Sequence, residues 1–414
     1  MKVLLINTFE TKGGAAVACK RLALALQKQG VEVNILVRDK NTSDPFVQSV
    51  VKTSFQKLYS KVAFLSERLQ IFLANGFSRK NLFAVSTASI GFNILKSKMV
   101  QEADIIHLHW VNQGLLSIRE IGALAKLGKP IVWTMHDMWP MTGICHHSGE
   151  CLRFKENCGI CKFLTSPAPH DLSYKVFKKK KRLVGNSNIT FVACSEWLQK
   201  KTAGSALMLG NAMTNIPNPI DTDFFKPGDK LKARQDLSLP TDKKLILFGA
   251  AIVSEKKKGI DYLMKATHLL SDLNNEVELV YFGQIKEELT GAFGLKTHPL
   301  GYISDMNTIL KMYQAVDCFV TPSLEENLPN MIMEAMSCGV PCIGFETGGI
   351  PEMITHRETG YIAQYLSAED LASGIRFVLT ENFKQKVRDS VLNKYTESVI
   401  AGRYIQLYEK ALNK

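Results

Sequence analysis

Short apolar runs alternate along this chain with longer segments in which apolar residues recur every three or four positions. The first run, residues 3–6, precedes a segment over 15–29 with helical spacing that ends at Gly30, a residue typical of helix ends. Later apolar runs occupy residues 31–37, 105–108, 130–135, 189–193, 245–248, 277–282, 315–320 and 340–345. Strands separated by helices in this rhythm predict an α/β fold with parallel, doubly wound sheets.

The alternation is interrupted at residues 216–221, where proline and asparagine predict a linker. A second set of strands and helices follows it. We therefore expect residues 1–215 to form an N-terminal Rossmann-like domain and residues 216–395 to form a second one. Residues 396–414 are predicted to form an amphipathic C-terminal helix that can pack back on the N-terminal domain.

One predicted helix lies within residues 50–100, where the simple alternation fits poorly. Its apolar residues at helical spacing, and the basic residues between them, are Phe55, Leu58, Val62, Leu65 and Leu69, with Lys57, Lys61 and Arg68. One interpretation is a surface helix whose apolar side faces the core, and the other is a basic, apolar face that lies near a membrane. A basic run over 177–182 leaves a similar choice between binding anionic lipid or phosphate and a solvated helix end.

The composition is that of a globular chain. Its 414 residues are 46% hydrophobic and 22% charged, which excludes extended disorder. The formal net charge of +12 favours an anionic partner, although a generally basic surface explains it as well. No apolar stretch is long enough to span a membrane, and Met1–Asn7 is too short for a signal sequence. We expect a cytoplasmic protein, either fully soluble or peripheral at the inner membrane surface.

Three glycine-containing segments follow apolar runs and precede helices. Gly13-Gly14 and Gly348–Glu352 each place backbone amides at a helix start, where they can bind an anion, although plain turns and helix initiation explain them too. Residues 248–259 end in three lysines and Gly259, which fits either a diphosphate site or a solvated charge run.

Two glutamates, Glu326 and Glu334, flank the start of a short predicted helix after the run over 315–320. Both fall near the carboxyl end of a strand, where open α/β sheets bind ligands. A carboxylate can accept hydrogen bonds from the vicinal hydroxyls of a sugar and can stabilise positive charge at an anomeric carbon. The alternative is that both acids only favour the helix dipole.

Four of the nine cysteines, Cys145, Cys151, Cys158 and Cys161, fall in one loop-rich stretch, residues 145–161. The two-residue gap between Cys158 and Cys161 is typical of metal ligands, and four thiolates would form a closed, structural zinc site. His146 or His147 could replace one ligand. The alternatives are four free thiols or two disulfides, which are rare in cytoplasm.

Taken in order, these motifs resemble one family, the retaining GT-B glycosyltransferases known as group 1 or family 4. The resemblance rests on Gly13-Gly14, Lys258-Gly259, Ser323, Glu326 to Glu334, Ala335–Gly339, Pro341, Gly348–Glu352 and the interdomain segment Asn218–Asp221 with Phe224 and Pro227. Within the family, Trp133–Gly143 followed by the four clustered cysteines is most similar to capsular or colanic-acid-type polysaccharide transferases.

The resemblance implies two Rossmann-like domains with an interdomain cleft, an N-terminal acceptor domain and a C-terminal donor domain. It implies transfer of a sugar, with retention, from a UDP- or GDP-sugar to an acceptor hydroxyl in cell-surface polysaccharide biosynthesis. The acceptor would be a glycan, which the basic and apolar first domain suggests is lipid-linked. No metal would be required for catalysis, and no nucleic acid would bind.

The resemblance also assigns roles to matching positions. Glu326, beside the transferred sugar, and His136, which contacts the donor sugar, would be the catalytic residues. The donor-binding residues would be Gly13, Gly14 and Lys258 at the diphosphate, Glu334 at the ribose, and Asn327, Leu328 and Asn330, whose amides orient the sugar. Two departures affect the donor contacts: Ala250 stands where the family usually has arginine, and Glu326 to Asn330 reads Glu-Asn-Leu-Pro-Asn.

Two other functions remain open on the sequence. A sugar-nucleotide epimerase or a phosphorylase would share the GT-B motifs. A zinc-containing nucleic-acid-binding protein would explain the basic charge and the cysteines, although basic and aromatic residues are not interleaved as base stacking requires.

Overall fold

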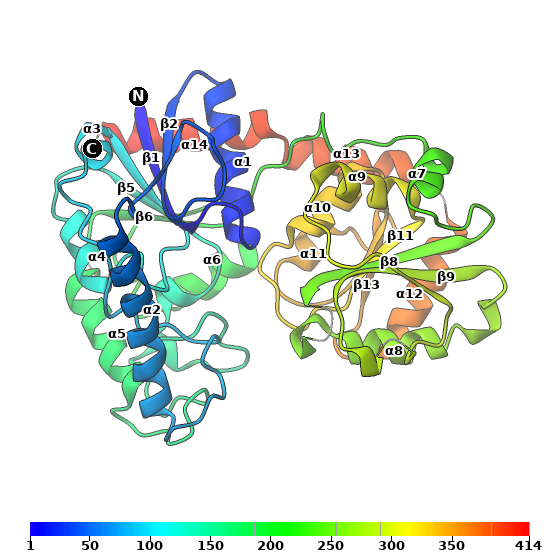
Figure 1. Cartoon of the computed structure of the whole chain (residues 1–414), viewed down its shortest axis with the longest axis horizontal. Coiled ribbons are helices and arrows are strands. Elements are labelled where there is room, and N and C mark those ends of the chain that lie inside the picture. Colours follow the sequence, from blue (N-terminus) through cyan, green and yellow to red (C-terminus); the bar gives the residue numbers. More distant parts are fainter. Residues whose placement is uncertain (186, 253–254, 290, 382, 414) are drawn as a thin grey trace. The chain divides into compact units, whose positions relative to one another are not determined.

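The computed structural model describes residues 1–185, 187–252, 255–289, 291–381 and 383–413 (Figure 1). The chain divides into two compact units. Unit 1 comprises Met1–Pro219 together with Ile400–Lys414, and unit 2 comprises Ile220–Val399. The division falls within the proline-rich segment that predicted a linker, and the last residues of the chain belong to unit 1.

Unit 1 is built on a seven-stranded sheet in the order β3-β2-β1-β4-β5-β6-β7, and every pair of neighbours is parallel. The strands are β1 (Lys2–Phe9), β2 (Glu32–Asp39), β3 (Val47–Ser49), β4 (Ile105–Leu108), β5 (Ile131–Met135), β6 (Ile189–Ala193) and β7 (Met213–Asn215). The chain builds outward from β1 in one direction and then crosses to β4 on the other side. The predicted parallel, doubly wound sheet is therefore confirmed.

The helices of unit 1 are α1 (Gly14–Lys28), α2 (Ser54–Ala74), α3 (Lys98–Glu102), α4 (Ile118–Leu124), α5 (Leu172–Leu183), α6 (Glu196–Ala203) and α14 (Glu397–Leu412), of which α14 begins in the last residues of unit 2. Side chains cap the N-termini of α2, α4, α5 and α6 by accepting hydrogen bonds from the first amides of each helix. Thr53 and Gln56 form a capping box at α2, and Ser117 and Glu120 form another at α4. Short 3-10 turns cover Trp139–Met141 (η1) and Arg153–Lys155 (η2).

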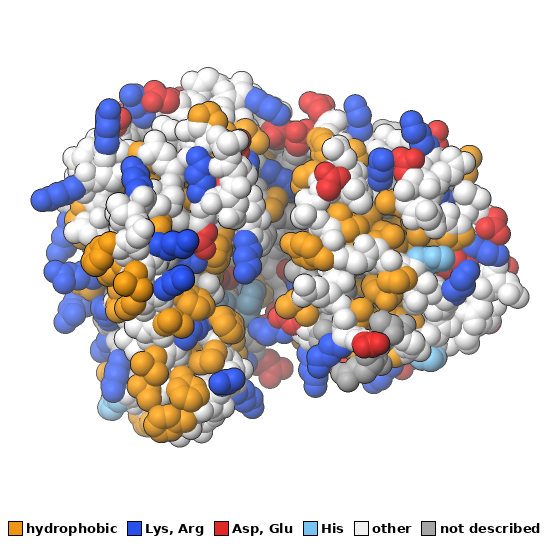
Figure 2. All heavy atoms as spheres, in the orientation of Figure 1, with side chains coloured by type: hydrophobic (Ala, Val, Ile, Leu, Met, Phe, Trp, Pro, Cys, Tyr) orange, Lys and Arg blue, Asp and Glu red, His pale blue; other side chains and the backbone are white. Residues whose placement is uncertain are grey.

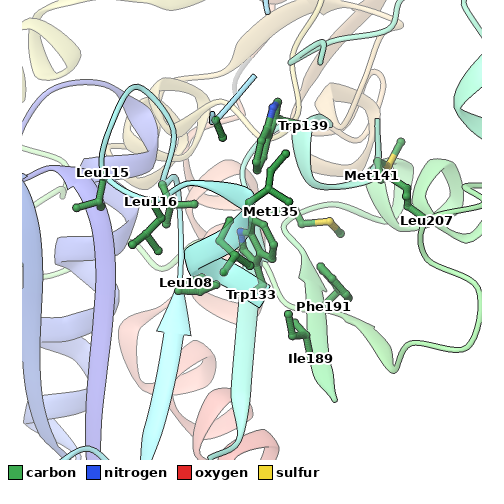
Figure 3. Packing of buried hydrophobic residues seen from close by; sticks show 14 of the residues in the cluster. Leu108, Leu115, Leu116, Trp133, Met135, Trp139, Met141, Ile189, Phe191 and Leu207 are labelled. Carbon is green, nitrogen blue, oxygen red and sulfur yellow. The ribbon is translucent and has the colours of Figure 1, made fainter. Parts of the chain in front are cut away.

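Alternate residues of the central strands enter two different apolar cores. Leu4 and Ile6 pack in one cluster, and Val3 and Leu5 pack in the other, because successive side chains of a strand point to opposite faces. Figure 3 shows part of the first cluster, in which the Trp133 ring stacks on Phe191 at 5.7 Å between centroids. The sheet is thus buried on both faces, as parallel sheets are.

The C-terminal helix α14 packs on unit 1 through two buried tyrosines. Tyr408 and Tyr404 belong to the second apolar cluster, with Ile400 and Ala401. The Tyr408 hydroxyl lies 2.7 Å from Nδ1 of His107 on β4, and the Tyr404 hydroxyl lies 2.8 Å from Oγ1 of Thr134 on β5. Residues remote in sequence therefore complete the core of unit 1.

Unit 2 contains a six-stranded parallel sheet in the order β10-β9-β8-β11-β12-β13. Its strands are β8 (Lys244–Ile252), β9 (Val277–Gln284), β10 (Thr297–Pro299), β11 (Cys318–Thr321), β12 (Cys342–Phe345) and β13 (Gly360–Ala363). Its helices are α7 (Lys230–Asp236), α8 (Ile260–His268), α9 (Met306–Ala315), α10 (Asn330–Ser337), α11 (Ile350–Met353), α12 (Ala368–Thr380) and α13 (Lys384–Lys394), with 3-10 turns η3 (Lys256–Lys258), η4 (Ser271–Leu273) and η5 (Glu287–Leu289).

The predicted helix after residue 50 is α2, but its orientation corrects the first interpretation of it. Phe55, Leu58 and Leu65 are 76%, 60% and 61% exposed, so the apolar stripe does not face the core. Arg68, predicted to stand beside the stripe, is buried. Among the described residues, no helix is long and apolar enough to cross a membrane.

Candidate functional site

The order of strands in unit 2 reverses between β8 and β11. The chain runs from β8 outward to β9 and β10, then returns to place β11 on the other side of β8. Loops that follow two such strands diverge at their carboxyl ends and leave a crevice, the usual ligand site of open α/β sheets. The loop after β8 carries Lys258, and the loop after β11 carries Ser323 and Glu326.

An ion pair joins these two loops. The Lys258 ammonium donates a hydrogen bond to Oε1 of Glu326, and the Ser323 hydroxyl donates to the same oxygen at 3.3 Å. Burial by itself lowers the pKa of Lys258, but the adjacent Glu326 carboxylate outweighs burial and raises the pKa above its usual value. Lys258 is therefore a cation at neutral pH, at a place where an anionic ligand can approach it.

Two glycines allow the loops to approach so closely. Gly259 and Gly348 have φ of 72° and 58°, a conformation that favours glycine. A Cβ atom on Gly259 would overlap the Pro322 carbonyl oxygen, and one on Gly348 would overlap the Glu326 carbonyl oxygen. The Gly348-Gly349 turn after β12 thus packs directly against the backbone of Glu326, so three loops meet at this edge.

Glu334 lies one turn into α10 and is buried. The hydroxyl of Tyr313, at the end of α9, donates a hydrogen bond to its Oε2 at 2.9 Å. Burial and the nearby carboxylate raise the Tyr313 pKa well above its usual value, so this hydroxyl remains a donor. Sequence reasoning missed Tyr313, because nothing in a residue 21 positions away indicates this contact.

The predicted donor-binding residues Asn327, Leu328 and Asn330 lie between the two glutamates. Asn327 and Leu328 are buried, and Asn330 is the first residue of α10. The residue before the helix, Pro329, makes no side-chain cap. In the loop after β8, Val253 and Ser254 of the lysine-containing motif lie outside the described residues.

The strand order of unit 1 reverses between β1 and β4, and Gly13 and Gly14 follow β1 there. Gly13 precedes α1 with φ of 87° and accepts hydrogen bonds from the amides of Ala16 and Val17. The glycine turn at a helix start is therefore where the sequence predicted it. Gly13 is exposed, and a Cβ atom there would meet nothing within 4 Å, so only its backbone conformation requires glycine.

His136 follows β5 and contacts a second histidine that sequence reasoning missed. Its Nε2 lies 2.9 Å from Nδ1 of His109, which directly follows β4. Burial lowers the pKa of His136 to about 4 and the pKa of His109 well below its usual value. Both rings are neutral at neutral pH, which makes His136 a hydrogen-bonding group rather than a cation. The position of His109 immediately after a buried apolar run was the signal that could have identified it.

The segment around His136 is held by Asp137. Its Oδ2 accepts hydrogen bonds from Nε1 of Trp110 at 2.8 Å and from Nδ1 of His146 at 2.7 Å. Burial raises the pKa of Asp137, but His146 foremost, then His147 and the Trp139 amide, outweigh burial and lower the pKa to about 2. The Nε2 of His146 lies 3.0 Å from the Ser86 hydroxyl. Both nitrogens of His146 are therefore engaged, and this ring does not replace a cysteine as a metal ligand here.

The four clustered cysteines line one small cavity of about 20 Å³. All four are free thiols, and Cys158 Sγ accepts a hydrogen bond from the Gly143 amide at 3.3 Å. Burial raises the pKa of Cys145 and of Cys158 to about 12. Within the part of the chain that the structure describes, however, no three His, Cys, Asp or Glu side chains are grouped so as to hold a metal ion. The cavity that the four cysteines share is consistent with a zinc site, but their side chains are not grouped as metal ligands. The zinc site therefore stays a prediction.

Two protein-family models together match nearly the whole chain. The sequence model of Glycosyltransferase Family 4 matches residues 12–224, and that of Glycosyl transferases group 1 matches residues 229–396. The D-inositol 3-phosphate glycosyltransferase of Mycobacteroides abscessus is 25% identical over 384 residues, 88% of this chain and 76% of that one. The enzyme of the same name from Corynebacterium aurimucosum is 24% identical over 399 residues, with 89% and 83% covered.

Solved structures share the architecture at low sequence identity. Sucrose-phosphate synthase from Thermosynechococcus elongatus has a TM-score of 0.67 at 17% identity, over 100% of this chain and 99% of that one. HepE from Anabaena, in complex with UDP-glucose, has a TM-score of 0.64 at 16% identity, over 99% and 100%. These likenesses confirm the expected GT-B class, with its two α/β domains built on parallel sheets.

Proposed function

The chain belongs to glycosyltransferase family 4, and we propose that it moves a sugar from a nucleotide-diphosphate-sugar to an acceptor hydroxyl with retention of configuration. The observation that carries this proposal is the Lys258–Glu326 pair at the point where the unit 2 sheet reverses its strand order. A cation and a carboxylate side by side suit a ligand that joins a diphosphate to a sugar. The UDP-glucose complex of HepE supports UDP-sugars as the first donors to test.

Within unit 2, each residue of the proposed donor site has a distinct task. Lys258 binds the diphosphate and stabilises the negative charge that grows on it as it leaves. Glu334, held by Tyr313 through one carboxylate oxygen, binds the ribose hydroxyls. Glu326 lies beside the transferred sugar and stabilises positive charge at its anomeric carbon. The backbone around Asn327, Leu328 and Asn330 orients that sugar.

Within unit 1, we assign the diphosphate contact to Gly13 and Gly14 and the donor-sugar contact to His136. The Nε2 of His136 is hydrogen-bonded to His109 and its Nδ1 lies 3.7 Å from Sγ of Cys194, so a sugar hydroxyl would bind at Nδ1 in place of that weak contact with sulfur. His109 is a positioning residue, because its hydrogen bond at 2.9 Å orients the His136 ring. Trp110 and His146 act one step further out, through Asp137.

The proposed reaction is a single group transfer. The acceptor oxygen forms a bond to the anomeric carbon as the bond from that carbon to the diphosphate breaks. The diphosphate leaves with the electron pair, and one of its oxygens takes the acceptor proton. Attack from the face that the diphosphate leaves preserves the anomeric configuration.

The acceptor that we propose is a glycan of a cell-surface polysaccharide, carried on a lipid. The similarity of Trp133–Gly143 to capsular and colanic-acid-type transferases supports the polysaccharide. The relatives from Mycobacteroides abscessus and Corynebacterium aurimucosum are named for D-inositol 3-phosphate, which is not a glycan. Donor and acceptor are therefore best tested separately.

Replacing Glu326 tests the proposed function. UDP- and GDP-sugars are first screened for thermal stabilisation and slow hydrolysis, and Glu326→Gln is then compared with wild type on the active donor. We expect turnover to fall by at least about a hundredfold, because the neutral amide no longer stabilises positive charge at the anomeric carbon.

The matched control is the adjacent Glu325→Gln. Glu325 pairs with Lys257 at 3.2 Å rather than with Lys258, so its loss should change turnover less than about threefold. Both variants should keep the unfolding temperature of the wild type. Full activity of Glu326→Gln would remove this carboxylate from the mechanism.

A further inference from the structure

Helix α2 presents its apolar side to solvent. Six large apolar side chains form this surface, the α2 apolar face: Phe55, Leu58, Val62, Leu65, Leu69 and Leu73, each at least 50% exposed. At about 100° per residue they fall within an arc of about 80°, so they form one continuous stripe along the 21-residue helix. A stripe of this size on a described surface indicates a contact with another molecule.

The opposite side of α2 is packed against the rest of unit 1 through two apolar residues, Ala63 and Ile71, and two charged ones, Glu67 and Arg68, all of which are buried. Glu67 Oε1 accepts hydrogen bonds from the amides of Thr87 at 2.7 Å and Ala88 at 3.3 Å. Arg68 forms an ion pair with Glu67 at 3.2 Å and donates to the Leu82 carbonyl. These bonds, together with the buried Ala63 and Ile71, hold this side of the helix inward. The α2 apolar face is therefore not a core surface that a rotation of the helix would bury.

Positive charge surrounds the α2 apolar face. Residues 51–100 contain eight Lys and Arg and a single acid, Glu67, which is turned inward. Lys57 and Lys61 are exposed along one edge of the stripe, and Arg79 and Lys80 are exposed just beyond the end of the helix. Figure 2 shows hydrophobic side chains gathered over α2 with Lys and Arg side chains beside them.

Two more exposed aromatic residues extend the apolar surface. Phe83 stacks on Phe64 of the helix at 6.5 Å between centroids, and Phe77 packs edge-on against Phe72 at 5.6 Å. Phe83 and Phe77 are 64% and 70% exposed. Aromatic rings beside a basic helix are typical of segments that lie at the boundary between lipid headgroups and acyl chains.

We propose that α2 docks unit 1 on an anionic lipid bilayer. The helix lies in the plane of the membrane, along its length of about 31 Å, with the α2 apolar face among the acyl chains. Lys57, Lys61, Arg79 and Lys80 bind the phosphates of the headgroups. The absence of exposed acids on α2 matches a negatively charged surface rather than a second, equally basic copy of the chain. Such docking would place the proposed lipid-linked acceptor in the same plane as the enzyme.

Vesicle binding tests this docking without any sugar donor. The full chain is mixed with sedimentable vesicles of phosphatidylcholine alone, or of about three parts phosphatidylcholine to one part phosphatidylglycerol. We expect binding to the anionic vesicles, weakened when salt rises from about 0.1 M to about 0.5 M. Because the assay contains no nucleotide-sugar, a failure of the proposed glycosyltransferase function would leave its result unchanged.

Two variants localise the contact. Leu58→Gln/Leu65→Gln/Leu69→Gln removes apolar surface and keeps good helix formers, and we expect it to lower binding by more than about tenfold. Lys57→Gln/Lys61→Gln tests the charge, and should lower binding by about fivefold for each lysine, since each is worth about 1 kcal/mol at such a surface. The control Leu231→Gln/Leu269→Gln/Leu412→Gln changes three leucines that are 59%, 47% and 44% exposed elsewhere, and should bind as wild type does.

Several results would overturn the proposal. They are no binding of the wild type to anionic vesicles, equal binding by the α2 leucine variant, or equal loss in the control. A dimer in light scattering that only the α2 leucine variant abolishes would show that a second copy covers the face instead. Circular dichroism and thermal unfolding check that each variant is folded. If the leucine variant fails to fold, the lysine variant, which changes no buried residue, still tests the docking.

Discussion

Mild acid should destabilise unit 1 through its buried histidines. Inside the core, both ring nitrogens of His107 form hydrogen bonds at 2.7 Å, one with the Tyr408 hydroxyl and one with the Thr134 hydroxyl. Burial, with repulsion from His136, lowers the pKa of His107 to about 3, and burial lowers the pKa of His136 to about 4. In the unfolded chain both should titrate near 6.5.

The sign follows from the protons that each state binds. Below about pH 6.5 the unfolded chain takes up protons that the folded chain refuses, so the free energy of unfolding falls as pH falls. Between about pH 7 and about pH 5.5 each of the two histidines should cost about 1.3 kcal/mol, or roughly 2.5 kcal/mol together. His109 shifts in the same direction and adds to this loss. The buried Lys180, with a pKa lowered by burial to about 7, has the same sign but acts mainly above pH 7.

Tryptophan emission can isolate this effect. All four tryptophans, Trp110, Trp133, Trp139 and Trp197, belong to unit 1, so urea unfolding followed by their fluorescence does not report on unit 2. We expect the unfolding free energy to fall by a few kcal/mol at the lower pH. His107→Gln should reduce the pH dependence, and the exposed His170→Gln should leave it unchanged. The same unfolding free energy at both pH values would refute the reasoning.

Two further predictions concern the glycine turn and the cysteines. Gly348→Ala should abolish donor-induced thermal stabilisation, because its Cβ would displace the Glu326 backbone; Gly301→Ala, with a similar φ of 68° but no atom within 4 Å, should keep it. Normal donor binding by Gly348→Ala would contradict the close approach of Gly348 to the Glu326 backbone. Metal analysis of purified protein should find about one zinc per chain, lost in Cys158→Ser but kept in Cys19→Ser. A metal-free, equally stable wild type would leave four free thiols as the correct interpretation.

Much of the fold was predictable because strands buried on both faces are continuous apolar runs. The runs over 105–108 and 189–193 coincide with β4 and β6. The three-residue strands β3, β7 and β10 were not predicted, because three residues are too few to show a recognisable alternation of apolar and polar positions. Each forms by pairing with the outer strand of a sheet that local sequence does not specify. The run over 315–320 began too early because Ala315 ends α9.

The kinds of element, the break between two units and the family could be recognised from local spacing and short motifs. Which side chains meet depends on the order of the strands in each sheet. Lys258 reaches Glu326 across 68 residues because β8 and β11 are neighbours in the sheet, and His109 reaches His136 because β4 and β5 are. The spacing of apolar residues in α2 was visible in the sequence, yet the structure packs Ile71, Glu67 and Arg68 inward and leaves that stripe exposed. Hydrophobic spacing predicts a helix, but the contacts that the helix makes in the folded chain decide which of its sides faces water.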